Sequence, residues 1–209
     1  MSWNRWIRTV EIVAAVSRSQ PVLLAGQADA LLRTGCRIFH VRVGADLGAL
    51  STVRLLAPLA KRYDGVISIQ IDGDPSPGAL AAVAEAGASS VTVQYEAVAD
   101  ARATLGWARE HGLAAGLAVA EGTDFEAVSA LAPDLVRSPG AHQYEQLKNV
   151  RLLSRALVPG TPIQVGGGLS HENVKELYQA GARLLVVGAA IFDREDLPRA
   201  YRRLVQALA

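Results

Sequence analysis

The sequence is poor in the features that tie a chain together or anchor it in a membrane. It contains a single cysteine, Cys36, which excludes an internal disulfide and favours a reducing compartment. No apolar run approaches the ~20 residues that a helix needs to cross a bilayer. The first ten residues, MSWNRWIRTV, lack the apolar region of a signal peptide. We therefore expect a cytoplasmic protein with no membrane partner.

An excess of charge of either sign is also absent. The chain has 21 basic and 20 acidic residues and a formal net charge of +1. A nucleic-acid-binding protein concentrates positive charge on one surface, and this balance predicts no nucleic-acid partner. Half of the residues are hydrophobic, which is enough for a large core in a chain of this length.

What the sequence does contain is a regular alternation of two kinds of segment. Short apolar or β-branched runs are predicted strands, at residues 10–16, 37–43, 65–71, 90–96, 114–120, 134–138, 162–168 and 184–190. Ala- and Leu-rich segments with apolar residues at helical spacing follow them, at residues 21–35, 51–63, 77–88, 99–112, 124–132, 144–158, 171–182 and 197–208. Eight strand–helix units predict parallel strands that close into an α/β fold, a single (β/α)8 TIM barrel domain over residues 1–209.

An open, doubly wound sheet is the alternative architecture. That fold would place a glycine-rich turn after an early strand. In this sequence the glycine-rich turns come late, at the ends of the seventh and eighth predicted strands. The position of the glycines therefore favours the barrel.

Two stretches of backbone without large side chains end the last two strands. Residues 166–168 are Gly-Gly-Gly, and residues 188–190 are Gly-Ala-Ala and lead into a helix that we expect to begin near Asp193. Barrels frequently build a phosphate site from the loops after strands seven and eight, and glycine lets backbone N–H groups approach an anion closely. We predict that a phosphoryl group is bound by Gly167, Gly168, Gly188 and Ala189. The alternative is that these glycines only make tight turns in a crowded barrel.

Three segments of the sequence resemble the ribulose-phosphate-binding barrels, above all the ribulose-phosphate 3-epimerases. They are IQVGGGLSHENVKELYQAGARLLVVGAAIF (163–192), AEAGASSVTVQYEA (84–97) and RIFHVRV (37–43). The resemblance runs over nearly the whole chain, because the order and length of all eight units fit. It implies a TIM barrel that binds a small phosphorylated substrate and assembles as a homodimer or larger homo-oligomer.

The departures from that family concern its metal site. The epimerases hold a divalent metal with a His and an Asp on strand two, a His on strand three and an Asp on strand seven, and the two Asp residues also exchange protons with the substrate. The corresponding residues in this sequence are His40, Arg42, Gln70 and Gly166, and a His of strand four corresponds to Gln94. An arginine repels a metal and a glycine carries no proton. We therefore expect no metal, no cofactor and no two-aspartate mechanism.

A second branch of the same superfamily contains the hexulose-phosphate synthases and keto-gulonate-phosphate decarboxylases. Those enzymes need an Asp-x-Lys-x-x-Asp motif after strand three. This sequence reads SIQIDGD at residues 68–74 and has no lysine there, so that catalytic set is missing as well.

The polar residues at the strand ends remain as candidates for catalysis. Residues two apart on a strand share a face, so His40 pairs with Arg42, Gln70 with Asp72, and Gln94 with Glu96, while the facing of Arg137 is open. The candidate catalytic residues are His40 as general base, Arg42 as the neutraliser of an enediolate or carboxylate oxygen, and Asp72 or Glu96 as second proton carrier. The candidate substrate contacts are Gln70, Gln94 and Arg137. The structural alternatives are a His40–Gln70 hydrogen bond and an ion pair of Arg42 with Asp72 or Glu96.

Three functions are compatible with these residues. The first is a metal-independent isomerase or epimerase that acts on a small phosphorylated sugar or keto acid through an enediol-like intermediate. The second is a lyase, either an aldolase or a decarboxylase, for a phosphorylated substrate. The third is a non-catalytic protein that binds a phosphorylated metabolite.

Overall fold

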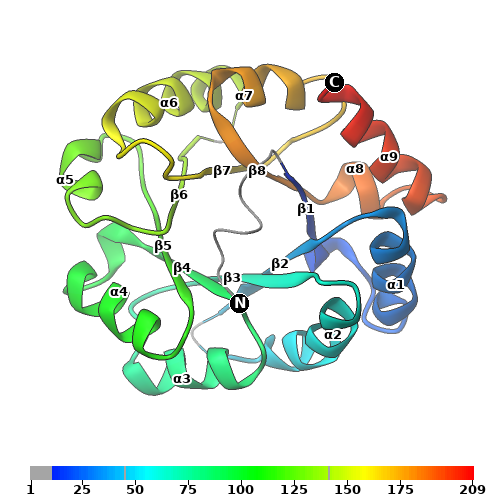
Figure 1. Ribbon diagram of the computed structural model, residues 1–209, viewed down its shortest axis with the longest axis horizontal. Helices are drawn as coiled ribbons and strands as arrows, with labels where there is room; N and C mark the ends of the chain where they lie inside the picture. Colours follow the sequence, from blue (N-terminus) through cyan, green and yellow to red (C-terminus); the bar gives the residue numbers. More distant parts are fainter. Residues whose placement is uncertain (1–10, 45, 141) are drawn as a thin grey trace.

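The fold is a closed barrel of parallel strands. A computed structural model describes residues 11–44, 46–140 and 142–209. Within these residues the strands are β1 (Glu11–Ala15), β2 (Ile38–Val43), β3 (Val66–Ile71), β4 (Ser90–Gln94), β5 (Ala114–Ala118), β6 (Leu135–Arg137), β7 (Ile163–Gly166) and β8 (Ala182–Val187). Each strand pairs with the next, and β8 pairs in parallel with β1 (Figure 1). The predicted (β/α)8 barrel is confirmed, and the open sheet is excluded.

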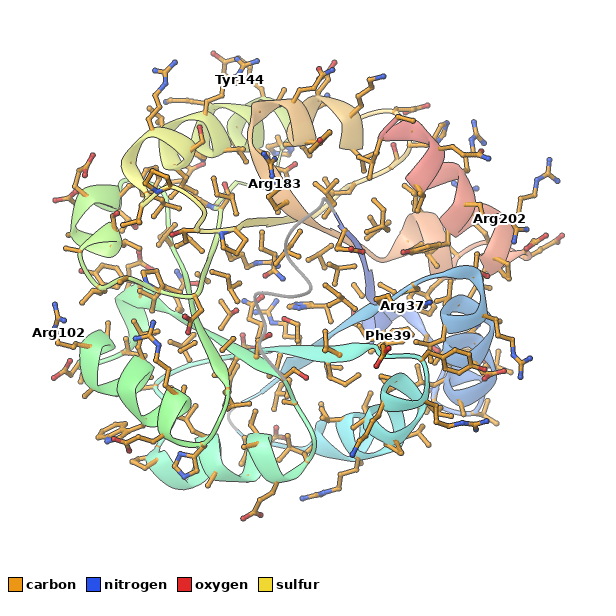
Figure 2. All side chains as sticks on the ribbon, viewed as in Figure 1. Arg37, Phe39, Arg102, Tyr144, Arg183 and Arg202 are labelled. Carbon is orange, nitrogen blue, oxygen red and sulfur yellow. The ribbon has the colours of Figure 1, made fainter. Side chains whose placement is uncertain are left out.

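Helices alternate with the strands and cover the outside of the barrel (Figure 1). They are α1 (Leu24–Thr34), α2 (Leu50–Arg62), α3 (Pro77–Glu85), α4 (Ala101–Glu110), α5 (Phe125–Ser129), α6 (Gln143–Ala156), α7 (Val174–Ala180), α8 (Ala189–Phe192) and α9 (Leu197–Ala207). Short 3-10 turns follow β1 at Val16–Arg18 and β4 at Tyr95–Ala97. Arg102 on α4, Tyr144 on α6 and Arg202 on α9 point outward from this ring (Figure 2).

Side-chain caps explain where several helices begin. In α3, α4, α5 and α9 a first-turn backbone amide donates a hydrogen bond to the side chain of the residue before the helix. These capping residues are Ser76, Asp100, Asp124 and Asp196, respectively. The expected helix start near Asp193 is wrong. The short helix α8 begins at Ala189 and ends at Phe192, with Asp193 as its C-cap, and α9 begins only after the Asp196 cap.

Alternation along the strands gives the barrel an outer and an inner face. On the outer face, the apolar strand residues pack against the helices in one large core. On the inner face, a smaller apolar cluster consists of Val13, Ile38, Val66, Ala114, Leu135, Leu184 and Val186. Toward the carboxyl ends of the strands the inner face becomes polar, because His40 follows Ile38 on β2 and Arg137 follows Leu135 on β6.

Several buried polar atoms of the barrel interior have no hydrogen-bond partner among the described residues. They are His40 Nδ1, Ser68 Oγ, Ser90 Oγ, Thr92 Oγ1 and Gln164 Nε2. An unpaired buried polar atom costs about 1–3 kcal/mol, and TIM barrel interiors are ordinarily filled with bulky branched apolar side chains. The interior of this barrel is therefore more polar than is usual for the fold.

Two expectations from the sequence concern membranes and export. Within the described residues, no helix is long and apolar enough to cross a bilayer. The segment MSWNRWIRTV, on which the expectation of no signal peptide rests, lies outside the described residues.

Candidate active site at the carboxyl ends of the strands

Strands β2 and β3 bring four polar residues to the carboxyl end of the barrel. His40 and Arg42 share the inner face of β2 with Ile38, and the β2–β3 register places Arg42 opposite Gln70. Asp72 follows Gln70 by two residues and lies on the same side. The structure therefore brings Arg42, Gln70 and Asp72 together, with His40 deeper in the barrel.

Arg42 and Asp72 form an ion pair at this end of the barrel. The Arg42 Nε donates to both carboxylate oxygens of Asp72, at 3.0 and 3.1 Å. This arrangement confirms one of the structural alternatives for Arg42. The side chains are 65% and 43% exposed, and an exposed pair contributes little to stability, ~1 kcal/mol or less. The pair remains accessible to a ligand and orients the Asp72 carboxylate.

His40 is a buried, neutral imidazole. Its side chain makes no hydrogen bond to Gln70 or to any other described residue, and its Nδ1 is without a partner. Burial, together with the positive charges of Arg137 and Arg42, lowers the pKa of His40 to about 3. A base with so low a pKa takes up protons poorly at neutral pH. The geometry therefore favours a hydrogen-bonding role for His40 over the general-base role that the sequence suggested.

The facing of Arg137, left open by the sequence, is toward the barrel interior. Its Nη1 donates to Gln164 Oε1 at 3.4 Å. Among the described residues it forms no ion pair, because the pairs there join Arg33 to Asp29, Arg42 to Asp72 and Arg109 to Asp134. Burial lowers the pKa of Arg137 to about 10, with a contribution from Arg42, so the guanidinium keeps its proton at neutral pH. Arg137 is a largely buried cation without a counter-charge.

Two polar side chains hold the glycine loop after β7 by its carbonyl groups. The Gln146 Nε2 on α6 donates to the oxygens of Gly166 and Gly167, at 3.2 and 2.9 Å. The Asn173 Nδ2, just before α7, donates to the oxygen of Gly168 at 3.1 Å. In a trans peptide the C=O and the following N–H point in opposite directions. The amides of Gly167 and Gly168 therefore point away from Gln146, and no described group accepts a hydrogen bond from them.

The loop after β8, which is the second predicted phosphate-binding loop, lies beside the glycine loop after β7. The β7–β8 register pairs Gly166 with Val186, so the residues after β8 adjoin residues 167–168. Gly188 precedes α8, and the amide of Ala189 donates to no described acceptor. Gly167 and Gly168 have φ values of +103° and +66°, which favour glycine. The four predicted phosphate-binding residues thus lie just after the carboxyl ends of two adjacent strands, and residues 167, 168, 188 and 189 are here called the amide cradle.

Gln94 and Glu96 are placed differently from the other candidates. The carboxylate of Glu96 accepts hydrogen bonds from Gln94, from Thr123 and from the amide of Ala120 at 3.0 Å. Burial raises the pKa of Glu96, but these hydrogen bonds outweigh burial and lower the pKa overall. Glu96 therefore connects the loops after β4 and β5 and keeps Gln94 beside it, an arrangement that favours a structural role.

The comparisons with known proteins show the family. The profile of the Ribulose-phosphate 3 epimerase family matches residues 75–192, which is more than half of the chain. The chain belongs to this family. Residues 75–192 include Gln94, Arg137 and the whole amide cradle, while β2 and β3 lie before the matched segment.

Relatives of this epimerase-family protein cover nearly all of its length. The ribulose-phosphate 3-epimerase of Aquifex aeolicus (strain VF5) is 27% identical over 207 residues, 88% of this chain and 93% of the relative. Ribulose-phosphate 3-epimerase 2 of Cupriavidus necator is 22% identical over 96% of this chain and 92% of the relative. The solved structure of thiamine phosphate pyrophosphorylase from Pyrococcus furiosus has a TM-score of 0.75 at 16% identity, over 97% of this chain and 96% of that one. This last likeness shows a common fold.

The epimerase resemblance implies a divalent metal, and the residues present do not fit one. Among the described residues, no group of three or more His, Cys, Asp or Glu side chains is placed to hold a metal ion. Where the resemblance expects four ligands, this epimerase-family protein has His40, Arg42, Gln70 and Gly166. The charges of Arg42 and Arg137 already disfavour a proton on His40, and they repel a metal cation for the same reason.

Gln146 and Asn173 support the amide cradle but were not identified from the sequence. Gln146 and Asn173 are 1% and 9% exposed, and both hold carbonyl oxygens of residues 166–168. Each lies in a segment whose pattern predicts an amphipathic helix, in which a polar residue ordinarily faces solvent. A glycine run followed by a buried amide side chain is recognisable only once the helices are placed around the barrel.

Proposed function

We propose that the protein is a sugar-phosphate enzyme that moves a proton at a carbon next to a carbonyl group, without a metal. The phosphoryl group of the substrate binds the amide cradle. The sugar extends over the barrel mouth toward Arg137, His40 and the Arg42–Asp72 pair. The names of the relatives, which are ribulose-phosphate 3-epimerases, support this substrate class.

One observation carries the proposal. Unpaired backbone amides of residues 167, 168 and 189 and an uncompensated guanidinium, Arg137, belong to the same end of one barrel. The two features are close, because a Cβ on Gly166 would lie 3.0 Å from Arg137 Nη2. A small molecule with a phosphoryl group at one end and an oxygen that gains negative charge at the other fits both.

Each residue then has a defined task. Asp72, oriented by Arg42, accepts the proton from the carbon next to the carbonyl, and the electron pair of the broken C–H bond moves into the carbonyl to give an enediolate. Arg137 and the neutral imidazole of His40 stabilise the new negative charge on oxygen, as preorganised donors do in a water-poor site. In an epimerisation a solvent proton is delivered to the same carbon on its opposite face, and Asp72 gives its proton to solvent. In an isomerisation Asp72 returns the proton to the neighbouring carbon.

The test is hydrogen exchange with solvent. D-ribulose 5-phosphate and other ketose phosphates are incubated in D2O with protein freed of metals by EDTA, and deuterium incorporation is followed by proton NMR. We expect incorporation next to the carbonyl and its loss, by at least 100-fold, in Asp72→Asn. Asp29→Asn is the matched control, because Asp29 forms an ion pair with Arg33 on the surface of α1.

The outcomes separate the alternative functions. Release of carbon dioxide or an aldehyde without deuterium incorporation would identify a lyase. Binding of ketose phosphates with neither reaction would identify a non-catalytic binding protein. Exchange that requires an added divalent metal would contradict the metal-free chemistry proposed here.

A further inference from the structure

Arg137 is not explained by the binding of a phosphoryl group alone. The amide cradle supplies its own donors for that group. Arg137 has five N–H donors, of which the structure uses one, in a 3.4 Å hydrogen bond to a neutral amide oxygen. Burying a cation is costly unless a counter-charge accompanies it, and none of the described residues provides one.

The sequence makes room for this guanidinium. A Cβ on Gly166 would lie 3.0 and 3.2 Å from Arg137 Nη2 and Nη1, so any side chain at residue 166 would compete with the guanidinium for space. Glycine at the end of β7 and arginine at the end of β6 are therefore coupled features. Together they put a positive charge where the epimerase resemblance expects an aspartate.

No carboxylate among the described residues is placed to pair with Arg137 at the barrel mouth. Arg42 is balanced by Asp72 at 3.0 Å, His40 is neutral, and Glu96 is turned into the loops after β4 and β5. A sugar with only hydroxyl and carbonyl groups would offer Arg137 a negative charge only in the enediolate, and would leave the guanidinium without a counter-charge when the substrate first binds. A planar carboxylate would match both the charge and the fork of a guanidinium.

From this geometry we propose that the substrate carries a carboxylate in addition to its phosphoryl group, and that Arg137 binds the carboxylate. The substrate class is a phosphorylated sugar acid or keto acid. This inference rests on the proposed function in one respect, because it requires the phosphoryl group in the amide cradle.

Matched ligand pairs test the proposal. The pairs are 3-phosphoglycerate with glycerol 3-phosphate, 4-phosphoerythronate with erythritol 4-phosphate, and 5-phosphoribonate with ribitol 5-phosphate. Within a pair, one molecule has a carboxylate where the other has a hydroxymethyl group. The three pairs differ in chain length, and therefore in the distance between the phosphoryl group and this end of the molecule. Affinities are measured by titration calorimetry in EDTA. We expect at least one acid to bind about 10- to 100-fold more tightly than its alcohol.

Arg137→Met should weaken the acids more than the alcohols and so remove this preference, and Arg137→Lys, which keeps the charge but not the fork, should lie between. Arg183→Met is the control, because Arg183 donates to the oxygens of Tyr178 and Ala182 and lies at the amino end of β8, the end opposite to the mouth. Melting temperatures confirm that each variant folds.

The outcomes distinguish this inference from the proposed function. If all six ligands fail to bind, the amide cradle itself is refuted and the inference with it. If alcohols and acids bind equally, or if Arg137→Met weakens both members of a pair equally, the cradle stands but Arg137 serves the phosphoryl group, and the carboxylate proposal is overturned.

Discussion

A substitution of Gly168 by alanine separates the binding role of the amide cradle from its role as a turn. Gly168 has a φ of +66°, and a Cβ there would meet no atom within 4 Å. The cost to folding is therefore backbone strain alone, ~1–2 kcal/mol for an alanine in the left-handed region. For a chain of this size we expect the melting temperature to fall by about 2–8 °C.

Gly112 is a matched control at the opposite end of the barrel. It follows α4, has a φ of +75°, and a Cβ there also meets nothing within 4 Å. Gly112→Ala should therefore lower the melting temperature by a similar amount. Only Gly168→Ala should also weaken the binding of glycerol 3-phosphate, by about 10- to 100-fold, because the strained loop turns one or two amides away from a charged ligand.

The assay combines thermal unfolding with titration calorimetry on both variants. Equal loss of stability with loss of binding in Gly168→Ala alone would support the cradle. If Gly168→Ala binds glycerol 3-phosphate as tightly as the unmodified protein does, then the glycines only make tight turns, and the reasoning from the unpaired amides is refuted.

Three further predictions follow from the environments of single side chains. His40 has a pKa of about 3 in the folded protein against 6.5 in the reference state, so between these pH values only the unfolded chain gains a proton. The free energy of unfolding should therefore fall by about 2 kcal/mol as the pH drops from 6.5 to 5.0. Denaturant titrations of His40→Gln should lack this pH-dependent loss. Glu96→Gln keeps an acceptor for Ala120 and Thr123, so the free energy of unfolding should change by less than about 1 kcal/mol and turnover by less than about tenfold; a larger loss of turnover would restore Glu96 as a catalytic candidate. Cys36 is buried with its pKa raised to about 12, so Ellman's reagent should label it only under unfolding conditions, and rapid labelling of the native protein would contradict its burial.

The architecture could be predicted from the sequence because the strand–helix alternation is repeated eight times. Each of the eight predicted strands overlaps an observed one, and the β2 run IFHVRV forms a strand whose alternate residues face opposite sides, as its pattern indicates. The same two-residue alternation put His40 and Arg42 on one face of β2, and in the structure they share the inner face with Ile38.

The site was less predictable where partners come from different units. Alternation along a strand left Asp72 and Glu96 equally available to Arg42, and only the packed barrel pairs Arg42 with Asp72 and turns Glu96 to Thr123. β6 is three residues long, too short for its pattern to give the facing of Arg137. The low pKa of His40 arises from burial beside two arginines that are distant in sequence.

A crystal structure with D-ribulose 5-phosphate bound would test the central claim most directly. The account predicts phosphoryl oxygens within about 3.2 Å of the amide nitrogens of Gly168 and Ala189, and the carbonyl end of the sugar beside Arg137 and His40. A groove of about 800 Å3 between the loop before α7, α8 and α9, lined by arginines including Arg199, offers a different place for an anion. A phosphoryl group held there, with the amides of the cradle unengaged, would contradict the account.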